Sequence, residues 1–360
     1  MVTITFILTL VVALAMLYVY LGSKTPPPPP YHLVNAVYGL VRPDFHTGRP
    51  TVCPTMTDDV RYPETTPPPN TANKHGEIEI LADGTPATHW YAEAAGVTWH
   101  FVTAGKPDRP VVLMLHGLPE SWWAFHHQIS DLSRDYYVIA LDCKGYGQSD
   151  KRLDLDYSAA TMARETAELL DQLGVAEFTI VAHDRGAVIA DHMTSVDSLK
   201  GRIRRYVRMQ QSFNEPHGDP RPPHDLFATK LGEGNFKFKY VIRTIYDKVM
   251  AAGLSPSTLK RLDYEFKFKG VAEAVRRYFQ SNNFDLEYKD RHNFLFAHMT
   301  MPMLILQGRY DPGQHPEEYA KSAEFAADLR VEFVDANHFS HIENPTAVNR
   351  AIRRFLDEPA

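Results

Sequence analysis

An aspartate stands between an apolar run and a helix-like segment in the stretch IVAHDRGA, residues 180–187. Two small residues, Ala182 and Gly186, flank Asp184 at the spacing of a nucleophile elbow, a strained strand-to-helix turn that presents one reactive side chain above a sheet. A carboxylate is already an anion near neutral pH, so it can attack a saturated carbon without a base to activate it. A role as helix N-cap is the alternative explanation for Asp184.

Two histidines follow a later apolar segment in the stretch ANHFSHIENP, residues 336–345. His338 and His341 are candidates for a general base, because an ester formed on a carboxylate breaks down when a water molecule is activated. Asp311, in QGRYDPG, is a candidate for the carboxylate that orients such a base, and Glu215 is the alternative. Turn formation in the Asp-Pro-Gly sequence is a second explanation for Asp311.

The elements that would position these residues alternate between short β-rich runs and helical stretches from about residue 87 onward. This pattern is typical of an α/β protein with a mostly parallel sheet. Strands are predicted as a pair within residues 90–105, joined by a turn at Ala95-Gly96, and at residues 111–117, 136–142, 178–183, 206–210, 303–311 and 330–338. Helices are predicted at residues 122–133 and 157–173, where Gly174 suits the end of the second helix.

A long insertion interrupts this alternation after the strand at residues 206–210, with helical, aromatic and basic residues throughout. An insertion between late strands is typical of a lid over the carboxyl edge of the sheet, where ligands bind in such folds. The sequence therefore predicts a core of residues 87–210 and 300–360 and a helical lid of residues 211–299.

The amino-terminal segment differs in composition from the rest of the chain. Residues 1–23 carry no charged side chain, and the run is long enough for a helix to cross a hydrocarbon layer of about 30 Å. We expect a single-pass transmembrane anchor, with a cleaved signal peptide as the alternative. Lys24 and Arg42 follow the span, which favours a cytosolic catalytic domain. The endoplasmic reticulum is a candidate membrane. Residues 24–86 form a predicted Pro-rich linker or extension, including the polyproline II spacer at residues 26–30.

Charge and cysteine content exclude several classes of protein. The net charge is −6, and the lysines and arginines are scattered rather than gathered in a polybasic block, so we expect no nucleic-acid partner. The two cysteines, Cys53 and Cys143, are too few for a disulfide framework and suggest no metal site. The sequence predicts neither a metal nor another cofactor, and it leaves the oligomeric state open.

Three motifs in order carry a resemblance to a known family. HGLPESWW (residues 116–123), DCKGYGQSD (residues 142–150) and the Asp184 elbow resemble those of the α/β-hydrolase-fold epoxide hydrolases, over about residues 87–357. The resemblance implies that Asp184 opens an epoxide, becomes an alkyl ester and is released by activated water. Esterases of the same superfamily usually carry serine at the elbow, whereas haloalkane dehalogenases share the aspartate.

The resemblance also assigns the base. The family's catalytic histidine stands seven residues before a proline and five before an acidic residue. Pro345 and Glu343 stand at these distances from His338, so the resemblance selects His338 rather than His341. It likewise places the orienting carboxylate at Asp311, after the penultimate strand.

Further site residues follow from the same resemblance. The oxyanion donors would be the backbone N–H groups of Leu118 and Arg185, and the peptide before Pro119 would be cis. The predicted residues of the substrate-binding loop are His116, Pro119 and Trp122. Two lid tyrosines, Tyr278 and Tyr240, would donate their phenolic hydrogens to the departing alkoxide.

Several positions depart from the epoxide hydrolase pattern. Arg185 stands where epoxide hydrolases commonly have an aromatic residue, and it matches fluoroacetate-type dehalogenases. Those dehalogenases have a second arginine where this chain has Val188, and a halide-binding His-Trp pair where it has Val241-Ile242. A dehalogenase is therefore the second hypothesis, and a non-catalytic receptor with this fold is the third. A small apolar epoxide, either a lipid or a xenobiotic, would suit a membrane-tethered enzyme.

Overall fold

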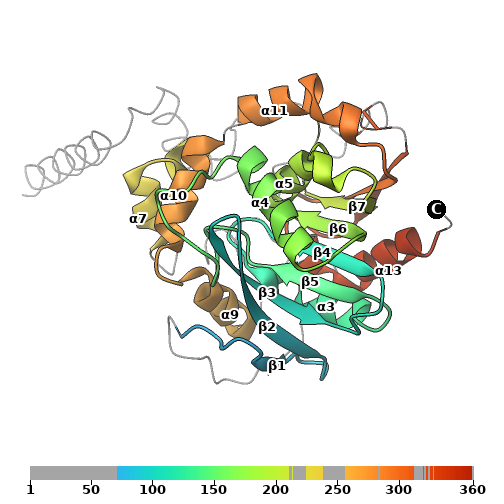
Figure 1. Cartoon of the computed structure of the whole chain (residues 1–360), viewed down its shortest axis with the longest axis horizontal. Coiled ribbons are helices and arrows are strands. Elements are labelled where there is room, and N and C mark those ends of the chain that lie inside the picture. Colours follow the sequence, from blue (N-terminus) through green and yellow to red (C-terminus); the bar gives the residue numbers. More distant parts are fainter. Residues whose placement is uncertain are drawn as a thin grey trace, which may run out of the picture.

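The computed structural model describes residues 71–210, 213, 224–237, 256–282, 284–311, 319, 322, 325–326 and 328–358. These residues form a sheet of order β1-β2-β3-β5-β4-β6-β7-β8-β9 (Figure 1). Its strands are β1 (Ile78–Ile80), β2 (Pro86–Ala94), β3 (Val97–Ala104), β4 (Val111–Leu115), β5 (Tyr137–Leu141), β6 (Phe178–His183), β7 (Ile203–Met209), β8 (Met303–Gly308) and β9 (Leu329–Val334).

The mostly parallel character of the sheet is confirmed. Strands β4 to β9 pair in parallel, whereas β1, β2 and β3 pair antiparallel and join the rest through β5. Every residue of β6 is buried, as expected for a strand covered on both faces. The predicted turn at Ala95-Gly96 joins β2 to β3, and both residues adopt positive φ (55° and 71°), as in the two-residue turns that suit hairpins.

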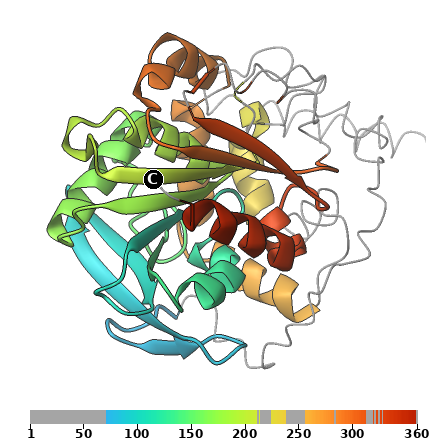
Figure 2. The same cartoon turned by 90° about the vertical axis from the view of Figure 1, so that its right-hand side faces the viewer.

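Helices cover both faces of the sheet. Helices α4 (Ala159–Gln172) and α5 (Arg185–Met193) pack together on one face. Helices α3 (His126–Leu132) and α13 (Pro345–Leu356) pack together on the other (Figure 2). Gly174 has φ +68° directly after α4, which agrees with its predicted place at the end of that helix.

The described part of the insertion is helical, as predicted. Between β7 and β8 lie α6 (His224–Phe227), α7 (Lys230–Phe236), α9 (Pro256–Phe266), α10 (Val271–Ser281), α11 (Phe284–Asn293) and the 3₁₀ turn η4 (Leu295–His298). Helix α10 buries residues three and four apart along one stripe and packs against α6 and α7. Figure 1 shows α7, α9 and α10 on one side of the molecule and α11 beside α5.

The core begins earlier than the predicted boundary at residue 87. Strand β1 pairs with β2 and adds an edge to the sheet, so residues 78–86 belong to the core rather than to the linker. The three-residue strand Ile-Glu-Ile is too short to show a periodic pattern in the sequence.

Predictions for the amino-terminal segment concern residues outside the described part of the chain. The proposed anchor at residues 1–23 and the proline run at residues 26–30 both lie there. In the part of the chain that the structure describes, no helix combines the length and the apolar character needed to cross a membrane.

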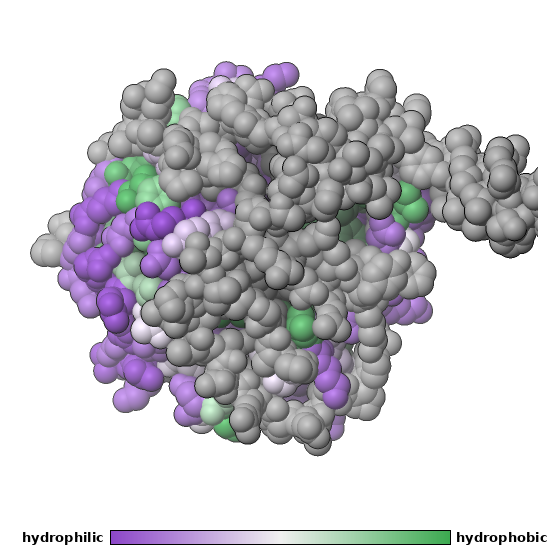
Figure 3. Space-filling view, turned by 180° about the vertical axis from the view of Figure 1, so that it is seen from behind, coloured by the Kyte–Doolittle hydropathy of each residue, from purple (hydrophilic) through white to green (hydrophobic). Residues whose placement is uncertain are grey.

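On the face shown in Figure 3, the described residues are mostly hydrophilic, with small apolar areas among the polar ones. The large hydrophobic side chains with the greatest exposure are Ile78, Ile80, Leu153, Leu286 and Phe294. Exposed apolar side chains of this kind are ordinary on folded domains.

Candidate active site

Asp184 stands on a strained turn between β6 and α5. Its backbone angles are φ 46° and ψ −116°, outside the regions that residues with a Cβ usually adopt. The close packing of the elbow requires Gly186, because a Cβ there would collide with the carbonyl oxygen of Leu115. Asp184 occupies the N-cap position of α5 but makes no side-chain capping hydrogen bond, so capping does not explain this aspartate.

The Asp184 carboxylate is held from two sides. The backbone N–H of Leu118 donates to Oδ1 at 2.9 Å, as expected for an oxyanion donor. On the other oxygen, Oδ2 lies 3.7 Å from His338 Nε2 and 3.7 Å from Arg185 Nε. The second predicted donor, the backbone N–H of Arg185, belongs to the first residue of α5, where helix N–H groups lack helical partners.

The predicted base and its orienting acid lie together. His338 Nδ1 is 2.8 Å from Asp311 Oδ2, which leaves His338 Nε2 facing Asp184. Asp311 is buried and also accepts a hydrogen bond from Gln307 Nε2 at 3.2 Å. The alternative acid, Glu215, lies outside the described residues.

Charges in this group stabilise one another. Burial alone would raise the pKa of Asp184, but His338 and Arg185 lower that pKa well below its usual value. Burial alone would lower the pKa of His338, but the carboxylates of Asp311 and Asp184 raise it well above its usual value. These shifts favour an Asp184 carboxylate beside a His338 imidazolium in the free protein.

The loop that carries Leu118 is fixed by its own side chains. His116 is buried, with Nδ1 2.9 Å from the carbonyl oxygen of Gly117 and Nε2 accepting from the backbone N–H of Cys143 at 3.0 Å. The peptide between Leu118 and Pro119 is cis, as the resemblance implied.

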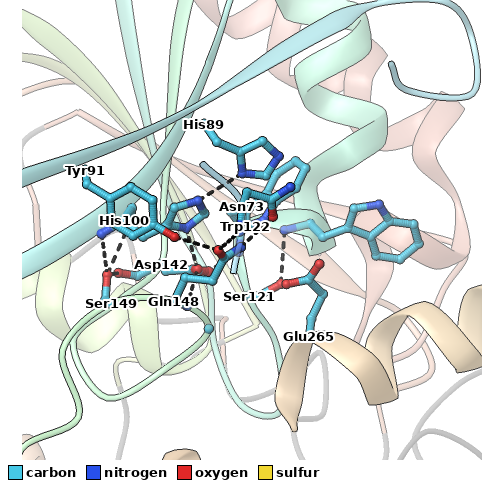
Figure 4. Close-up of polar contacts among 12 residues, drawn as sticks. Asn73, His89, Tyr91, His100, Ser121, Trp122, Asp142, Gln148, Ser149 and Glu265 are labelled. Atoms are coloured by element: carbon cyan, nitrogen blue, oxygen red, sulfur yellow. Dashed lines mark hydrogen bonds and ion pairs between the residues drawn. The ribbon is translucent and has the colours of Figure 1, made fainter. Parts of the chain in front are cut away.

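A second buried cluster supports the same loop (Figure 4). Asp142 Oδ1 accepts from the backbone N–H of Trp122 at 3.0 Å, and Oδ2 lies 2.7 Å from His100 Nδ1. His100 Nε2 in turn lies 3.0 Å from His89 Nδ1. The predicted substrate contact Trp122 has no exposed surface and packs edge-on against His89 at a ring distance of 5.2 Å, so this tryptophan supports the loop from within.

One of the two predicted lid tyrosines is described. Tyr278, on α10, is 1% exposed. Burial raises the pKa of its phenol, Arg185 opposes that rise, and the charge of Asp184 adds to it. The phenol therefore stays protonated near neutral pH within the electrostatic field of the nucleophile. Tyr240 lies outside the described residues.

A lid residue that sequence reasoning missed neutralises Arg185. Glu287, on α11, accepts a hydrogen bond from a terminal nitrogen of Arg185 at 2.7 Å, and both side chains are buried. The two residues are 102 positions apart in the chain, so no local pattern could indicate the pair.

His341, the alternative base, belongs to another group. Its Nε2 lies 3.0 Å from Glu120 Oε1, and Glu120 also contacts His183. Within the described residues, these three side chains offer the one set of three potential metal-ligand atoms that lie within 4.8 Å of one another. Glu120 already accepts hydrogen bonds there, so we interpret the group as a hydrogen-bonded cluster.

Replacing Gly117 by alanine is expected to lower turnover by about 10²-fold, the scale of a misplacement of roughly 1 Å in a catalytic group. The added Cβ would lie 2.5 Å from the Cβ and 2.7 Å from Oδ1 of Asp184, so either the loop or the nucleophile must move. Steady-state assays would measure the loss. Gly234→Ala is the control, because a Cβ there meets nothing within 4 Å, and equal activity of the two variants would contradict the expectation.

Comparisons with known proteins agree with this geometry. A family model described as the alpha/beta hydrolase fold matches residues 110–345. A Mus musculus protein named Epoxide hydrolase 4 is 35% identical over 113 residues, which are 31% of this chain and 32% of that protein, so the match spans about a third of the relative. A Caenorhabditis elegans protein named Epoxide hydrolase 1 is 33% identical over 294 residues, which cover 74% of this chain and 70% of that protein.

A solved structure supports the fold in the same way. An epoxide hydrolase from Vigna radiata superposes with a TM-score of 0.62 at 22% identity, covering 75% of this chain and 97% of that one. The fold, the order of the motifs and the relatives all support the same family. The chain belongs to the α/β-hydrolase fold family, and within it to the group whose members are named epoxide hydrolases.

Proposed function

We propose that this protein hydrolyses epoxides to vicinal diols through a covalent ester on Asp184. The observation that carries the proposal is an aspartate on the strained elbow, bound by the Leu118 N–H on one oxygen and facing the His338–Asp311 pair with the other. A serine at this position would give an acyl-transfer enzyme instead.

In the first half-reaction, Asp184 attacks one carbon of the epoxide. Oδ2 is the attacking oxygen, because Oδ1 already accepts from Leu118 and becomes the carbonyl oxygen of the new ester. The carbon–oxygen bond of the ring breaks, and the alkoxide takes the phenolic proton of Tyr278.

Formation of the ester changes the charge of the base. Asp184 loses its negative charge, so one of the two carboxylates that raise the pKa of His338 disappears. His338 then releases its proton, which restores the phenol of Tyr278, and its Nε2 becomes able to accept a proton from water.

Hydrolysis of the ester completes the cycle. His338 takes a proton from water, and the hydroxide adds to the ester carbonyl while the Leu118 N–H stabilises the negative charge on Oδ1. The ester bond breaks and the proton on His338 moves to the leaving oxygen. The carboxylic acid left on Asp184 then gives its proton to His338, which restores the starting carboxylate and imidazolium. Asp311 keeps the imidazole oriented throughout.

The dehalogenase hypothesis is second because of Arg185. An anionic substrate or a departing halide needs an available cation, whereas the Arg185 guanidinium is already paired with Glu287 in a buried site. The receptor hypothesis is third, because Asp184, His338 and Asp311 are all present and lie close together.

The proposed substrate is a small apolar epoxide of lipid or xenobiotic origin, and no cofactor or metal takes part in the proposed reaction. Residues 1–23 support a single-pass membrane anchor, because they are uncharged and long enough to cross the roughly 30 Å apolar layer. Apolar epoxides partition into such a layer, and an anchored catalytic domain on its cytosolic side would meet them there.

The test of function uses the purified full chain in detergent with an aryl epoxide, a fatty-acid epoxide, a haloalkane and fluoroacetate. We expect diol from at least one epoxide and no halide release. Halide release without diol would favour the dehalogenase hypothesis, and inactivity toward all four would favour the receptor.

Replacing Tyr278 by phenylalanine is expected to slow ester formation by roughly one to three orders of magnitude, because the alkoxide loses a hydrogen-bond donor. The substitution removes only the hydroxyl of a buried ring, so the fold should be retained. Rapid-quench measurement of the ester would give the rate. Tyr264→Phe is the control, since that phenol donates to the backbone of Thr71 outside the site, and an unchanged rate in Tyr278→Phe would assign Tyr278 to packing.

A further inference from the structure

A second buried group of ionisable side chains adjoins the catalytic residues without being part of the proposed reaction. It consists of Glu120 from the loop after β4, His183 at the end of β6 and His341 from α12 (Ser340–Glu343), and is called here the Glu120 cluster. All three side chains are at most 1% exposed. The rings of His183 and His341 lie 4.3 Å apart.

The Glu120 cluster connects three catalytic segments through their backbones. Glu120 Oε2 accepts from the backbone N–H of Gly117 at 2.8 Å, directly before the oxyanion donor Leu118. The same oxygen lies 2.8 Å from Nδ1 of His183, directly before the nucleophile. His183 Nε2 lies 3.0 Å from the backbone carbonyl oxygen of the base, His338.

The hydrogen-bond partners of His183 determine its charge. Its two ring nitrogens each face an oxygen acceptor, the Glu120 carboxylate and the His338 carbonyl. A neutral imidazole has one N–H and can satisfy one of these acceptors, whereas an imidazolium satisfies both. These two contacts therefore favour a proton on each nitrogen.

The neighbouring groups agree with this charge. Burial alone would raise the pKa of Glu120, but His183 and His341 lower it well below its usual value, so Glu120 is a carboxylate. Burial and His183 lower the pKa of His341 to about 4, so His341 is neutral near pH 7. The negative charge of Glu120 and a positive charge on His183 thus compensate each other in a buried site.

We propose that Glu120 and His183 form a buried carboxylate–imidazolium pair whose role is to position the oxyanion loop and the base against the ester on Asp184. This inference rests on the proposed function. The positive charge is essential, because a neutral His183 would release either the Glu120 carboxylate or the carbonyl that holds His338.

The two half-reactions depend on this pair to different degrees. Ester formation needs Asp184 and Tyr278, neither of which has a side-chain contact with Glu120 among the hydrogen bonds described above. Ester hydrolysis needs both His338 and the Leu118 N–H to be correctly placed at the ester carbonyl. The pair binds the backbone of His338 itself and that of Gly117, the residue before Leu118. Disturbing the pair should therefore slow hydrolysis more than ester formation.

Glu120→Gln in the full chain tests this expectation, because glutamine keeps the shape of the side chain and removes its charge. We expect ester hydrolysis to slow by roughly 10- to 100-fold, from a small displacement of the base, and ester formation to change far less. Intact-mass spectra after rapid mixing with an epoxide should show the alkylated protein accumulating. Glu165→Gln is the matched control, since it removes the charge from a half-buried carboxylate paired with the buried Lys144, and it should leave the ratio of the two rates as in the wild type.

The charge of His183 can be read directly by NMR of ¹⁵N-histidine-labelled full chain, with His183→Gln identifying its signals. Both nitrogens of His183 should be protonated at neutral pH in the wild type, and one should lose its proton in Glu120→Gln. A neutral His183 in the wild type, or equal slowing of both half-reactions in Glu120→Gln, would overturn the inference. Absence of diol from the wild type would instead refute the proposed function. The NMR result would still show whether Glu120 and His183 form a charged pair.

Discussion

The His338→Gln variant is expected to form the ester on Asp184 and then stop. Asp184 and Tyr278 remain in place, so one equivalent of epoxide should react per chain, while diol release falls by roughly two to four orders of magnitude without the base. The mass of the protein should increase by that of the epoxide, and the addition should map to the peptide that contains Asp184. The rate of diol release in Asp311→Asn should lie between those of His338→Gln and the wild type, because the imidazole is then present but poorly oriented.

His341→Gln is the comparison that distinguishes the two histidines. It leaves both the His338–Asp311 pair and the Glu120–His183 pair in place, so repeated turnovers without accumulating ester are expected. Trapped ester in His341→Gln together with normal turnover in His338→Gln would identify His341 as the base.

The Asp184→Ala variant is expected to lose both half-reactions. No other carboxylate takes its place at the Leu118 N–H, so turnover should fall by about four to six orders of magnitude, the scale found when a nucleophile is removed. Neither an adduct nor diol should appear above background, by mass spectrometry and by a diol assay. Removal of the strained aspartate should leave the protein folded, which circular dichroism can check.

A double variant separates a covalent role of Asp184 from an electrostatic one. Asp184→Ala combined with His338→Gln should show no ester, in contrast to His338→Gln alone. An adduct in the double variant would mean that another residue is alkylated.

The structure brings together the three catalytic candidates that the sequence singled out, Asp184, Asp311 and His338, and each of them stands in a local pattern. Asp184 lies between two small residues at the end of a mostly apolar strand, and Asp311 follows another mostly apolar strand within three residues. His338 has a proline and an acidic residue at fixed distances. The elbow around Asp184 is visible within fewer than ten residues, whereas the choice of His338 and Asp311 also depended on the resemblance to a known family.

The partners that surround the site could not be predicted in the same way. Glu287 reaches Arg185 from 102 positions away, and Asp142 meets His100 from 42 positions away. Pairs of this kind depend on how the lid and the strands pack, which no local spacing encodes. Trp122 illustrates the same limit, because an aromatic residue in a loop motif can face a substrate or, as here, be packed beneath the loop.

The most direct test of the covalent mechanism is a single turnover in ¹⁸O-labelled water, with the full chain in excess over the epoxide. The diol and the peptide that contains Asp184 are then analysed by mass spectrometry. A covalent mechanism predicts that the new oxygen of the diol comes from the unlabelled Asp184 carboxylate and that the Asp184 peptide gains one ¹⁸O atom. A diol that carries ¹⁸O after this first turnover, with Asp184 unlabelled, would show that water attacks the epoxide directly and would contradict the mechanism.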